Sequence, residues 1–122
     1  MSGVVWFIGV VEKVVDELST ILIYPPYVPG LEGLECYGRL NIIYWLHEAD
    51  KPEIRKTLHV TPRRHGATEP RGVFATHSPH RPNPVGLTTV DLVKVDGNRL
   101  VVRGLDAFEA SPILDIKPEE HM

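Results

Sequence analysis

Residues 88–105 read TTVDLVKVDGNRLVVRGL, and this stretch decides the fold class. Two apolar runs in it flank Asp96-Gly97-Asn98. An Asp-Gly pair between two such runs is the strongest short-range signal for a β-hairpin, because these residues accept the positive φ angles that a tight turn needs. We therefore expect antiparallel strands at residues 88–95 and 99–105.

The rest of the chain contains further strand-like runs. Composition rich in β-branched and aromatic residues predicts strands at residues 4–11, 17–24, 40–47, 54–61 and 113–116, and residues 72–76 open as another. Gly9 indicates a bulge or close packing. Three prolines make residues 24–30 a stiff connection without regular structure, and residues 31–38 predict a short helix or turn. We therefore predict an all-β fold, a small single-sheeted antiparallel β-barrel with long loops and at most a short helix.

Length and composition limit the class of protein. With 122 residues, of which 43% are hydrophobic, the chain predicts one domain over residues 1–122. It has no apolar run near the ~18 residues that span a bilayer and no basic start with a small-residue cleavage site, so we expect a cytoplasmic protein without a membrane span. The single cysteine, Cys36, excludes an internal disulfide and a multi-thiolate zinc site, and we expect it to be buried.

Charge is unevenly distributed along the chain. The formal net charge is −3, which argues against a general nucleic-acid coat protein. Residues 51–81 nevertheless contain seven of the 13 lysines and arginines: Lys51, Arg55, Lys56, Arg63, Arg64, Arg71 and Arg81. A locally positive face attracts a phosphate backbone, although a solvated charged loop without a partner is the alternative.

Residues 72–87 read GVFATHSPHRPNPVGL and form the candidate active loop. Its three prolines hold the preceding residues in extended geometry, so the loop is stiff and poor in backbone donors. It carries two imidazoles, a hydroxyl, a guanidinium and a carboxamide on this track, at His77, Ser78, His80, Arg81 and Asn83. Because a preordered loop lowers the entropy cost of holding a ligand, we interpret these side chains as a binding or catalytic set.

Other chemistries have weaker support. No G-x-G-x-x-G follows a strand and no P-loop is present, so a nucleotide cofactor would bind without a glycine-rich cradle. His77-x-x-His80 offers two imidazoles to a metal but no obvious third ligand, and we expect no metal. Ser78 lacks the nucleophile-elbow motif of a hydrolase.

The active loop, together with LDAFEASPILDIKP at residues 105–118, resembles the TrmO family, also called the YaeB, VirR or TsaA-like family. Its members read GVFATRS-x-x-RPNPIG and later D-G-T-P-V-x-DIKPY. The resemblance implies an S-adenosylmethionine-dependent methyltransferase that acts on the exocyclic amine of threonylcarbamoyl-adenosine beside the tRNA anticodon. It also implies a small β-barrel that works as a homodimer.

Candidate site residues follow from the resemblance and from the basic stretch. The resemblance places cofactor contacts at Leu46, His47, His77, Leu87, Glu109, Ala110, Ser111 and Pro112. Arg81 suits a phosphate or carboxylate, and Asn83 suits an adenine edge or bracing of the loop. The catalytic candidates are His80, Arg81, Asn83 and Asp115, with His77, His80 and Asp115 left as alternative proton acceptors. The RNA-binding candidates are Arg55, Arg63, Arg64 and Arg71.

The sequence departs from the family pattern in three places. The family's early P-R-Q segment has no counterpart between Glu12 and Ser19, and His77 stands where the family has arginine. Residues 109–112 read EASP where the family has D-G-T-P. These changes leave an alternative function, a non-catalytic S-adenosylmethionine- or nucleotide-binding module with a regulatory role.

Overall fold

A computed structural model describes residues 1–63 and 66–120 of the chain. The chain divides into two compact units, unit 1 with Met1–Trp45 and Leu87–Met122, and unit 2 with Leu46–Gly86. The single domain over residues 1–122 stays a prediction.

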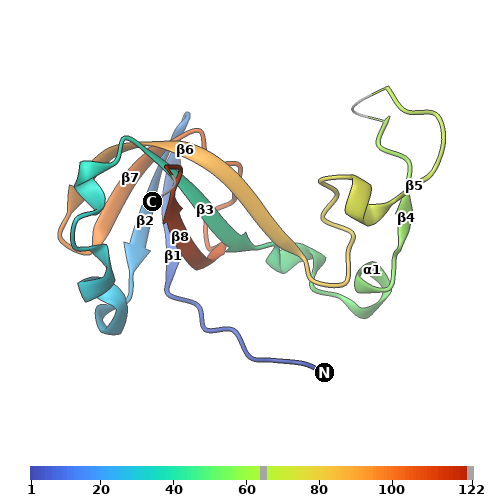
Figure 1. Ribbon diagram of the computed structural model, residues 1–122, viewed down its shortest axis with the longest axis horizontal. Coiled ribbons are helices and arrows are strands. Elements are labelled where there is room, and N and C mark those ends of the chain that lie inside the picture. The colour runs from blue at the N-terminus through green and yellow to red at the C-terminus, as the bar shows by residue number, and fades with distance from the viewer. Residues whose placement is uncertain (64–65, 121–122) are drawn as a thin grey trace. The chain divides into compact units, whose positions relative to one another are not determined.

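Unit 1 is built on one antiparallel sheet that curves round into a barrel (Figure 1). Its strands are β1 (Gly9–Val15), β2 (Leu18–Ile23), β3 (Arg39–Trp45), β6 (Val85–Asp96), β7 (Arg99–Arg103) and β8 (Pro112–Pro118). Their order around the sheet is β1-β2-β7-β6-β3-β8, and β8 returns to β1. The predicted all-β class and the single-sheeted antiparallel β-barrel are confirmed.

The core follows the two-residue period of the strands. Ile21 and Ile23 of β2, Leu40 and Ile42 of β3, and Leu100 of β7 are at most 1% exposed, while their neighbours in sequence are partly exposed. Side chains of a strand alternate between the two faces of a sheet, so one set fills the inside of the barrel.

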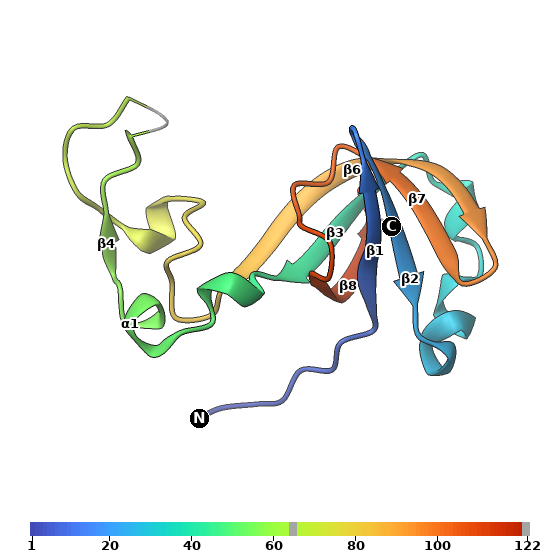
Figure 2. The ribbon, with the colours of Figure 1, turned by 180° about the vertical axis from the view of Figure 1, so that it is seen from behind.

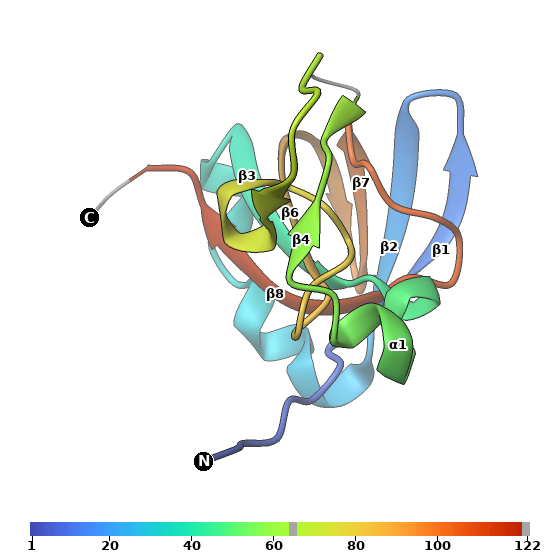
Figure 3. The same ribbon diagram turned by 90° about the vertical axis from the view of Figure 1, so that its right-hand side faces the viewer.

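Two hairpins make up most of the sheet. The predicted hairpin is confirmed, since β6 and β7 are joined by a turn in which Gly97 has φ 62°. Figure 3 shows β1 and β2 side by side, and their turn places Asp16 at φ 54°. Close packing at Gly9 is also confirmed, because a Cβ there would lie 2.3 Å from the carbonyl oxygen of Leu22.

The first half of the predicted strand at residues 4–11 is wrong. β1 begins only at Gly9, and Val4, Val5, Trp6 and Phe7 are 83%, 58%, 73% and 40% exposed. We call residues 1–7 the N-terminal arm; it runs out from the start of β1 (Figure 2). A run of apolar residues shows that a segment suits a sheet, but it does not show whether a neighbouring strand is available.

The seam between β1 and β8 is short. The two strands pair at Gly9–Ile113 and Val10–Pro112, and Ile8 N donates to the Ile113 carbonyl at 2.8 Å. β8 continues from there to Pro118, paired with β3. Among the described residues, β8 beyond Ile113 therefore has a strand neighbour on one side only.

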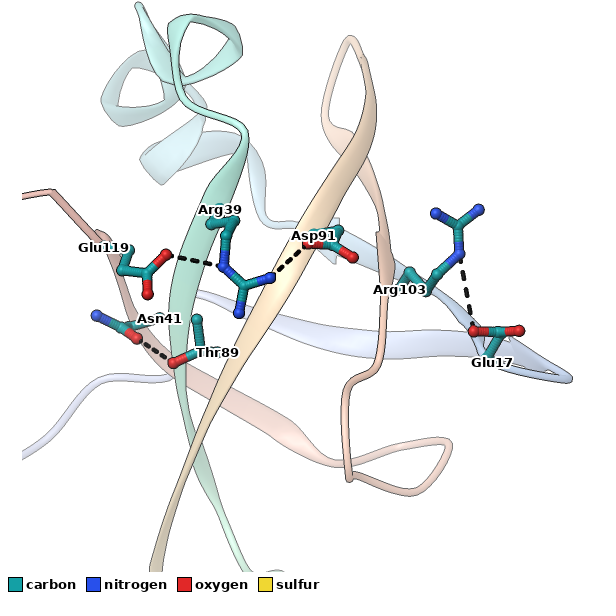
Figure 4. Close-up of polar contacts among 7 residues, drawn as sticks. All are labelled: Glu17, Arg39, Asn41, Thr89, Asp91, Arg103 and Glu119. Carbon is teal, nitrogen blue, oxygen red and sulfur yellow. Dashed lines mark hydrogen bonds and ion pairs between the residues drawn. The ribbon is translucent and has the colours of Figure 1, made fainter.

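Polar side chains on the outer surface connect neighbouring strands (Figure 4). Arg39 of β3 bonds Asp91 of β6 and Glu119 just after β8, each at 2.8 Å. Asn41 and Thr89 form a further β3–β6 contact at 2.7 Å. Because the ion pairs are about half exposed, each contributes less than about 1 kcal/mol. Their effect is to hold β3 between its two neighbours.

The connection from β2 to β3 differs from two expectations. Residues 24–30 were expected to lack regular structure, but Pro25–Leu31 form the 3-10 helix η1. Proline is tolerated at the start of a helix, where its missing N–H has no partner to lose. The short helix expected nearby is η2 (Leu34–Cys36). Cys36 is exposed rather than buried, because it lies on this surface turn.

Unit 2 consists of short elements: η3 (His47–Ala49), α1 (Pro52–Arg55), β4 (His59–Val60), β5 (Arg71–Gly72) and η5 (Val73–Ala75). The strand predicted at residues 54–61 is wrong except for β4, which pairs with β5. Pro52 at the first helical position favours α1 over an extended start. The strand predicted at residues 72–76 is also wrong, because η5 follows Gly72. Within the described residues, no helix has the length and apolarity to cross a membrane.

Candidate functional site

The first part of the active loop is braced by hydroxyl groups. The Thr76 hydroxyl donates to the carbonyl of buried Val73 at 2.8 Å, and Ser78 N donates to Thr76 Oγ1 at 3.1 Å. His80 N donates to Ser78 Oγ at 3.1 Å. These bonds satisfy backbone donors in a segment whose prolines prevent regular pairing.

Arg81 braces the same segment from its other end. Its Nη1 donates to the carbonyls of Thr76 at 3.1 Å and Ser78 at 3.0 Å. A guanidinium has five N–H donors, so these two contacts use only part of its capacity. Its capture of a phosphate or carboxylate stays a prediction.

Arg55, at the end of α1, reaches the RPNP part of the loop. Its Nε donates to the Pro82 carbonyl at 2.7 Å, and its Nη1 pairs with Asp50 at 2.9 Å. Its Nη2 lies 3.4 Å from Asn83 Oδ1. The guanidinium thus contacts the loop directly, whereas the RNA contact predicted for Arg55 stays a prediction. No sequence motif indicated this contact or the part of Asp50 in it.

The backbone carbonyls of residues 82–84 are all hydrogen-bonded. Pro82 accepts from Arg55, Asn83 accepts from Val85 N at 2.8 Å, and Pro84 accepts from Leu46 N at 2.8 Å. The last bond brings Leu46, a predicted cofactor contact, next to the RPNP segment. His47 follows it and begins η3.

The side chains of the active loop differ in exposure. His77, His80 and Asn83 are exposed, while Arg81 is partly buried. Phe74 is 77% exposed, an unusual position for a large aromatic residue. Phe74 lies in residues 72–76, which the sequence predicts as a strand, so its side chain was not expected to be a candidate for ligand contact.

In unit 1, residues 108–111 form a tight turn seated on β1, closed by a hydrogen bond from Ser111 N to the Phe108 carbonyl at 3.1 Å. Ala110 has φ 73°, and its N–H donates to the Val11 carbonyl at 2.8 Å. Ser111 is buried, and its Oγ accepts from Phe108 N at 3.1 Å. The turn is therefore fixed by its own side chain and by the neighbouring strand.

Glu109 and Leu87 occupy different environments in unit 1. Glu109 Oε1 accepts from Val14 N of β1 at 3.0 Å, so part of this carboxylate is committed to the backbone. Leu87 is 64% exposed and Phe108 is 66% exposed. Large apolar side chains left in water suit contact with an apolar ligand or partner.

Tyr44 is a polar group in unit 1 that the sequence did not indicate. It is 4% exposed, and its hydroxyl donates to the Asp106 carbonyl at 2.5 Å and lies 3.0 Å from Thr88 Oγ1. Burial raises the pKa of Tyr44; the hydrogen bond with Thr88 lowers it and the Asp106 charge raises it further. Tyr44 stands at an inward-facing position of the alternating pattern of β3, so the sequence alone indicates a core residue and not a buried hydrogen-bonding group.

Asp115, a catalytic candidate, lies on β8 in unit 1. Its Oδ1 accepts from Ile116 N at 2.8 Å. It lines two neighbouring cavities of about 210 and 400 Å³, which also share Ile8 and Tyr27. The other catalytic candidates, His80, Arg81 and Asn83, belong to unit 2.

The remaining site predictions are likewise distributed between the units. Leu46, His47 and His77 belong to unit 2, whereas Leu87, Glu109, Ala110, Ser111 and Pro112 belong to unit 1, and their forming one cofactor site stays a prediction. Of the RNA-binding candidates, Arg63 and Arg71 are exposed, and Arg64 lies outside the described residues. Among residues 1–63 and 66–120, no three His, Cys, Asp or Glu side chains are grouped to hold a metal ion.

Comparison with known proteins gives consistent results. A family model described as tRNA-methyltransferase O N-terminal domain matches residues 11–120. A probable S-adenosyl-L-methionine-binding protein of Methanothermobacter thermautotrophicus is 48% identical over 103 residues, which are 84% of this chain and 70% of that protein. An S-adenosyl-L-methionine-binding protein of Archaeoglobus fulgidus is 44% identical, covering 84% and 69%.

Solved structures agree with the sequence comparisons. A crystal structure of TrmO superposes with a TM-score of 0.76 at 29% identity, covering 98% of this chain and 58% of the other. TrmO from Pseudomonas aeruginosa superposes with a TM-score of 0.74 at 27% identity, covering 98% and 57%. This chain therefore spans little more than half the length of each of these solved chains.

Proposed function

Because the chain belongs to the tRNA-methyltransferase O N-terminal domain family, we propose that it is an S-adenosylmethionine-dependent methyltransferase. We propose as its substrate the exocyclic amine of threonylcarbamoyl-adenosine beside the tRNA anticodon. The observation that carries the proposal is the RPNP loop, whose backbone is held rigid by Arg55, Arg81 and Leu46. A rigid loop suits a reaction in which alignment of two reactants supplies most of the rate.

The residues present fit the proposed cofactor. Within unit 1, Leu87 and Phe108 expose large apolar side chains that the adenine ring or the methionine chain of a ligand would cover. Leu46, His47, His77, Leu87, Glu109, Ala110, Ser111 and Pro112 are the residues that would hold it. The sulfonium of S-adenosylmethionine supplies an already activated methyl group.

The chain's own part in the reaction is positioning and proton removal. Arg81 and Asn83 would orient the reactants from a loop whose own carbonyls are bonded. The acceptor amine must lose a proton, and His80 or Asp115 would receive it. Arg63 and Arg71, both exposed, would contact RNA phosphates. We also propose a homodimer, which light scattering tests.

The main experiment compares anticodon-loop nucleosides from cells with and without the gene by mass spectrometry. We expect the methylated threonylcarbamoyl nucleoside to disappear without the gene and to return when the gene is restored. Restoration with His80→Ala and Asp115→Ala variants tests the two proton acceptors. An unchanged nucleoside profile would exclude this substrate.

A regulatory binding module is the second candidate. The curated relatives described above are named as binding proteins rather than enzymes. The family's P-R-Q segment is absent from residues 12–19, which form part of the β1–β2 hairpin instead. Loss of this segment is the sequence change that favours a binding module over an enzyme. Calorimetry with S-adenosylmethionine separates the candidates when combined with the nucleoside profile, since a module binds the cofactor without changing any nucleoside.

A further inference from the structure

Asn83 is the most exposed polar side chain of the RPNP segment, since Arg81 is partly buried. The carbonyls of residues 82–84 are all bonded, and the two prolines have no N–H to offer. Asn83 is exposed, so its carboxamide, like the guanidinium of Arg81, is a group with which this segment can recognise a ligand.

The orientation of this carboxamide is set by Arg55. The guanidinium is fixed by two shorter bonds, to the Pro82 carbonyl at 2.7 Å and to Asp50 at 2.9 Å. Asn83 Oδ1 lies 3.4 Å from Nη2 of the same guanidinium. The reverse orientation would place the two N–H groups of Nδ2 against a group that has only donors. Oδ1 therefore faces Arg55, and Nδ2 faces away from it.

We propose that Arg55 is a positioning residue that presents Nδ2 of Asn83 as a donor to an acceptor oxygen of the ligand. This deepens the proposed function and rests on it. The ligand group must be an acceptor, because Nδ2 can only donate, and we assign it to a carboxylate, carbonyl or phosphate oxygen, the acceptors that are common to cofactor and RNA. The bidentate contact with an adenine edge, which needs both amide atoms of an asparagine, is not open to this side chain. Three sources offer such an oxygen: the carboxylate of the cofactor, an RNA phosphate and the threonyl carboxylate of the modified base.

The decisive variant is Asn83→Asp. A carboxylate at this position still accepts from Arg55 and adds an ion pair, but it has lost the two donors of Nδ2. We therefore expect the melting temperature to stay the same or rise, while ligand affinity falls at least tenfold. A residue that only braces the loop would keep its affinity. Asn83→Leu is expected to lower affinity as well, which separates loss of the donor from charge repulsion.

The source of the oxygen is found by calorimetry with matched ligands. Parent and Asn83→Asp are titrated with S-adenosylmethionine, with its decarboxylated analogue, and with anticodon stem-loop RNA with and without the threonylcarbamoyl group. A loss confined to the intact cofactor assigns its carboxylate. A loss with both RNAs assigns a phosphate, and a loss with the modified RNA alone assigns the threonyl carboxylate. Equal affinities of parent and variant for every ligand overturn the proposal.

A measurement without ligand keeps this inference separate from the proposed function. The side-chain amide resonance of Asn83 is assigned as the one missing in Asn83→Asp. We expect Arg55→Lys, which loses the planar fork, to shift this resonance, and the exposed neighbour variant Lys56→Ala to leave it in place. An unmoved resonance in Arg55→Lys overturns the proposal. If the parent protein binds neither cofactor nor RNA, the proposed function fails, whatever the resonance does.

Discussion

At the scale of single residues, Ala110 is a non-glycine residue in the left-handed region, with φ 73°. The family pattern has glycine at this place. An L-residue in this conformation costs the folded protein about 1–2 kcal/mol. Glycine would remove this strain, but it would also raise the entropy of the unfolded chain, which offsets part of the gain. We expect Ala110→Gly to raise the free energy of unfolding by about 0.5–1 kcal/mol and the melting temperature by roughly 3 °C, measured by calorimetry.

Ala107→Gly is the matched control in the same loop. Ala107 is not among the residues with positive φ, so glycine there only adds freedom to the unfolded chain. Its melting temperature should fall slightly. A fall in Ala110→Gly as well would show that the left-handed conformation is not strained in the folded protein.

Tyr44 predicts a pH effect at the alkaline end. Its pKa is raised above the ordinary 10.0, so the folded protein holds the phenolic proton more tightly than the unfolded chain does. The stability that this supplies is fully present below pH 10 and is lost as the pH rises through the folded pKa. We expect the parent to lose more free energy of unfolding between pH ~9 and ~11 than Tyr44→Phe, measured by urea titration. Parallel curves would contradict the pKa shift.

At the scale of strands, Gly9 is a position where β1 leaves no room for a side chain against β2. A Cβ at Gly9 would lie 2.3 Å from the Leu22 carbonyl oxygen, which is backbone and cannot move away cheaply. We expect Gly9→Ala to cost roughly 3 kcal/mol, because the two strands must separate. Gly3→Ala is the control, since it meets no atom within 4 Å, and it should leave the urea midpoint unchanged. Equal midpoints for both variants would contradict the close approach.

Strands were predictable where their signal is local. The hairpin around Gly97 was found because turn and strand signals lie within one short stretch. Residues 4–8 and 54–58 failed for a different reason: β-branched composition favours extended structure but carries no information about a partner strand. At residues 52–55 the proline at the helix start was the stronger signal.

The site was predictable only in part. The three prolines of the active loop and the polar residues between them can be read from the sequence. The hydrogen-bonded carbonyls of residues 82–84 agree with the stiff backbone that these prolines predict. The role of Arg55 was not visible, because its contact with Pro82 joins residues 27 positions apart. Tyr44 was hidden for a similar reason, since its partners Thr88 and Asp106 are 44 and 62 positions away.

At the scale of the whole molecule, binding of RNA by a protein of net charge −3 must depend on a local patch. Arg63 and Arg71 are both exposed in the basic stretch. We expect the double variant Arg63→Ala, Arg71→Ala to weaken tRNA binding and to reduce the slope of log affinity against log salt by about 2. Affinity for S-adenosylmethionine should not change. Identical salt slopes would remove these residues from the RNA surface.

The half-paired strand β8 has a consequence for solubility. A strand with one free edge invites edge-to-edge association with other chains, and charged side chains on that edge oppose it. Asp115 lies at this place, next to Ile113, Leu114 and Ile116, and its carboxylate occupies the backbone N–H of Ile116. Asp115→Val would create a continuous β-prone apolar run and release that N–H for another chain. We expect this variant to form thioflavin-positive aggregates at concentrations where the parent and Asp115→Lys remain clear by light scattering.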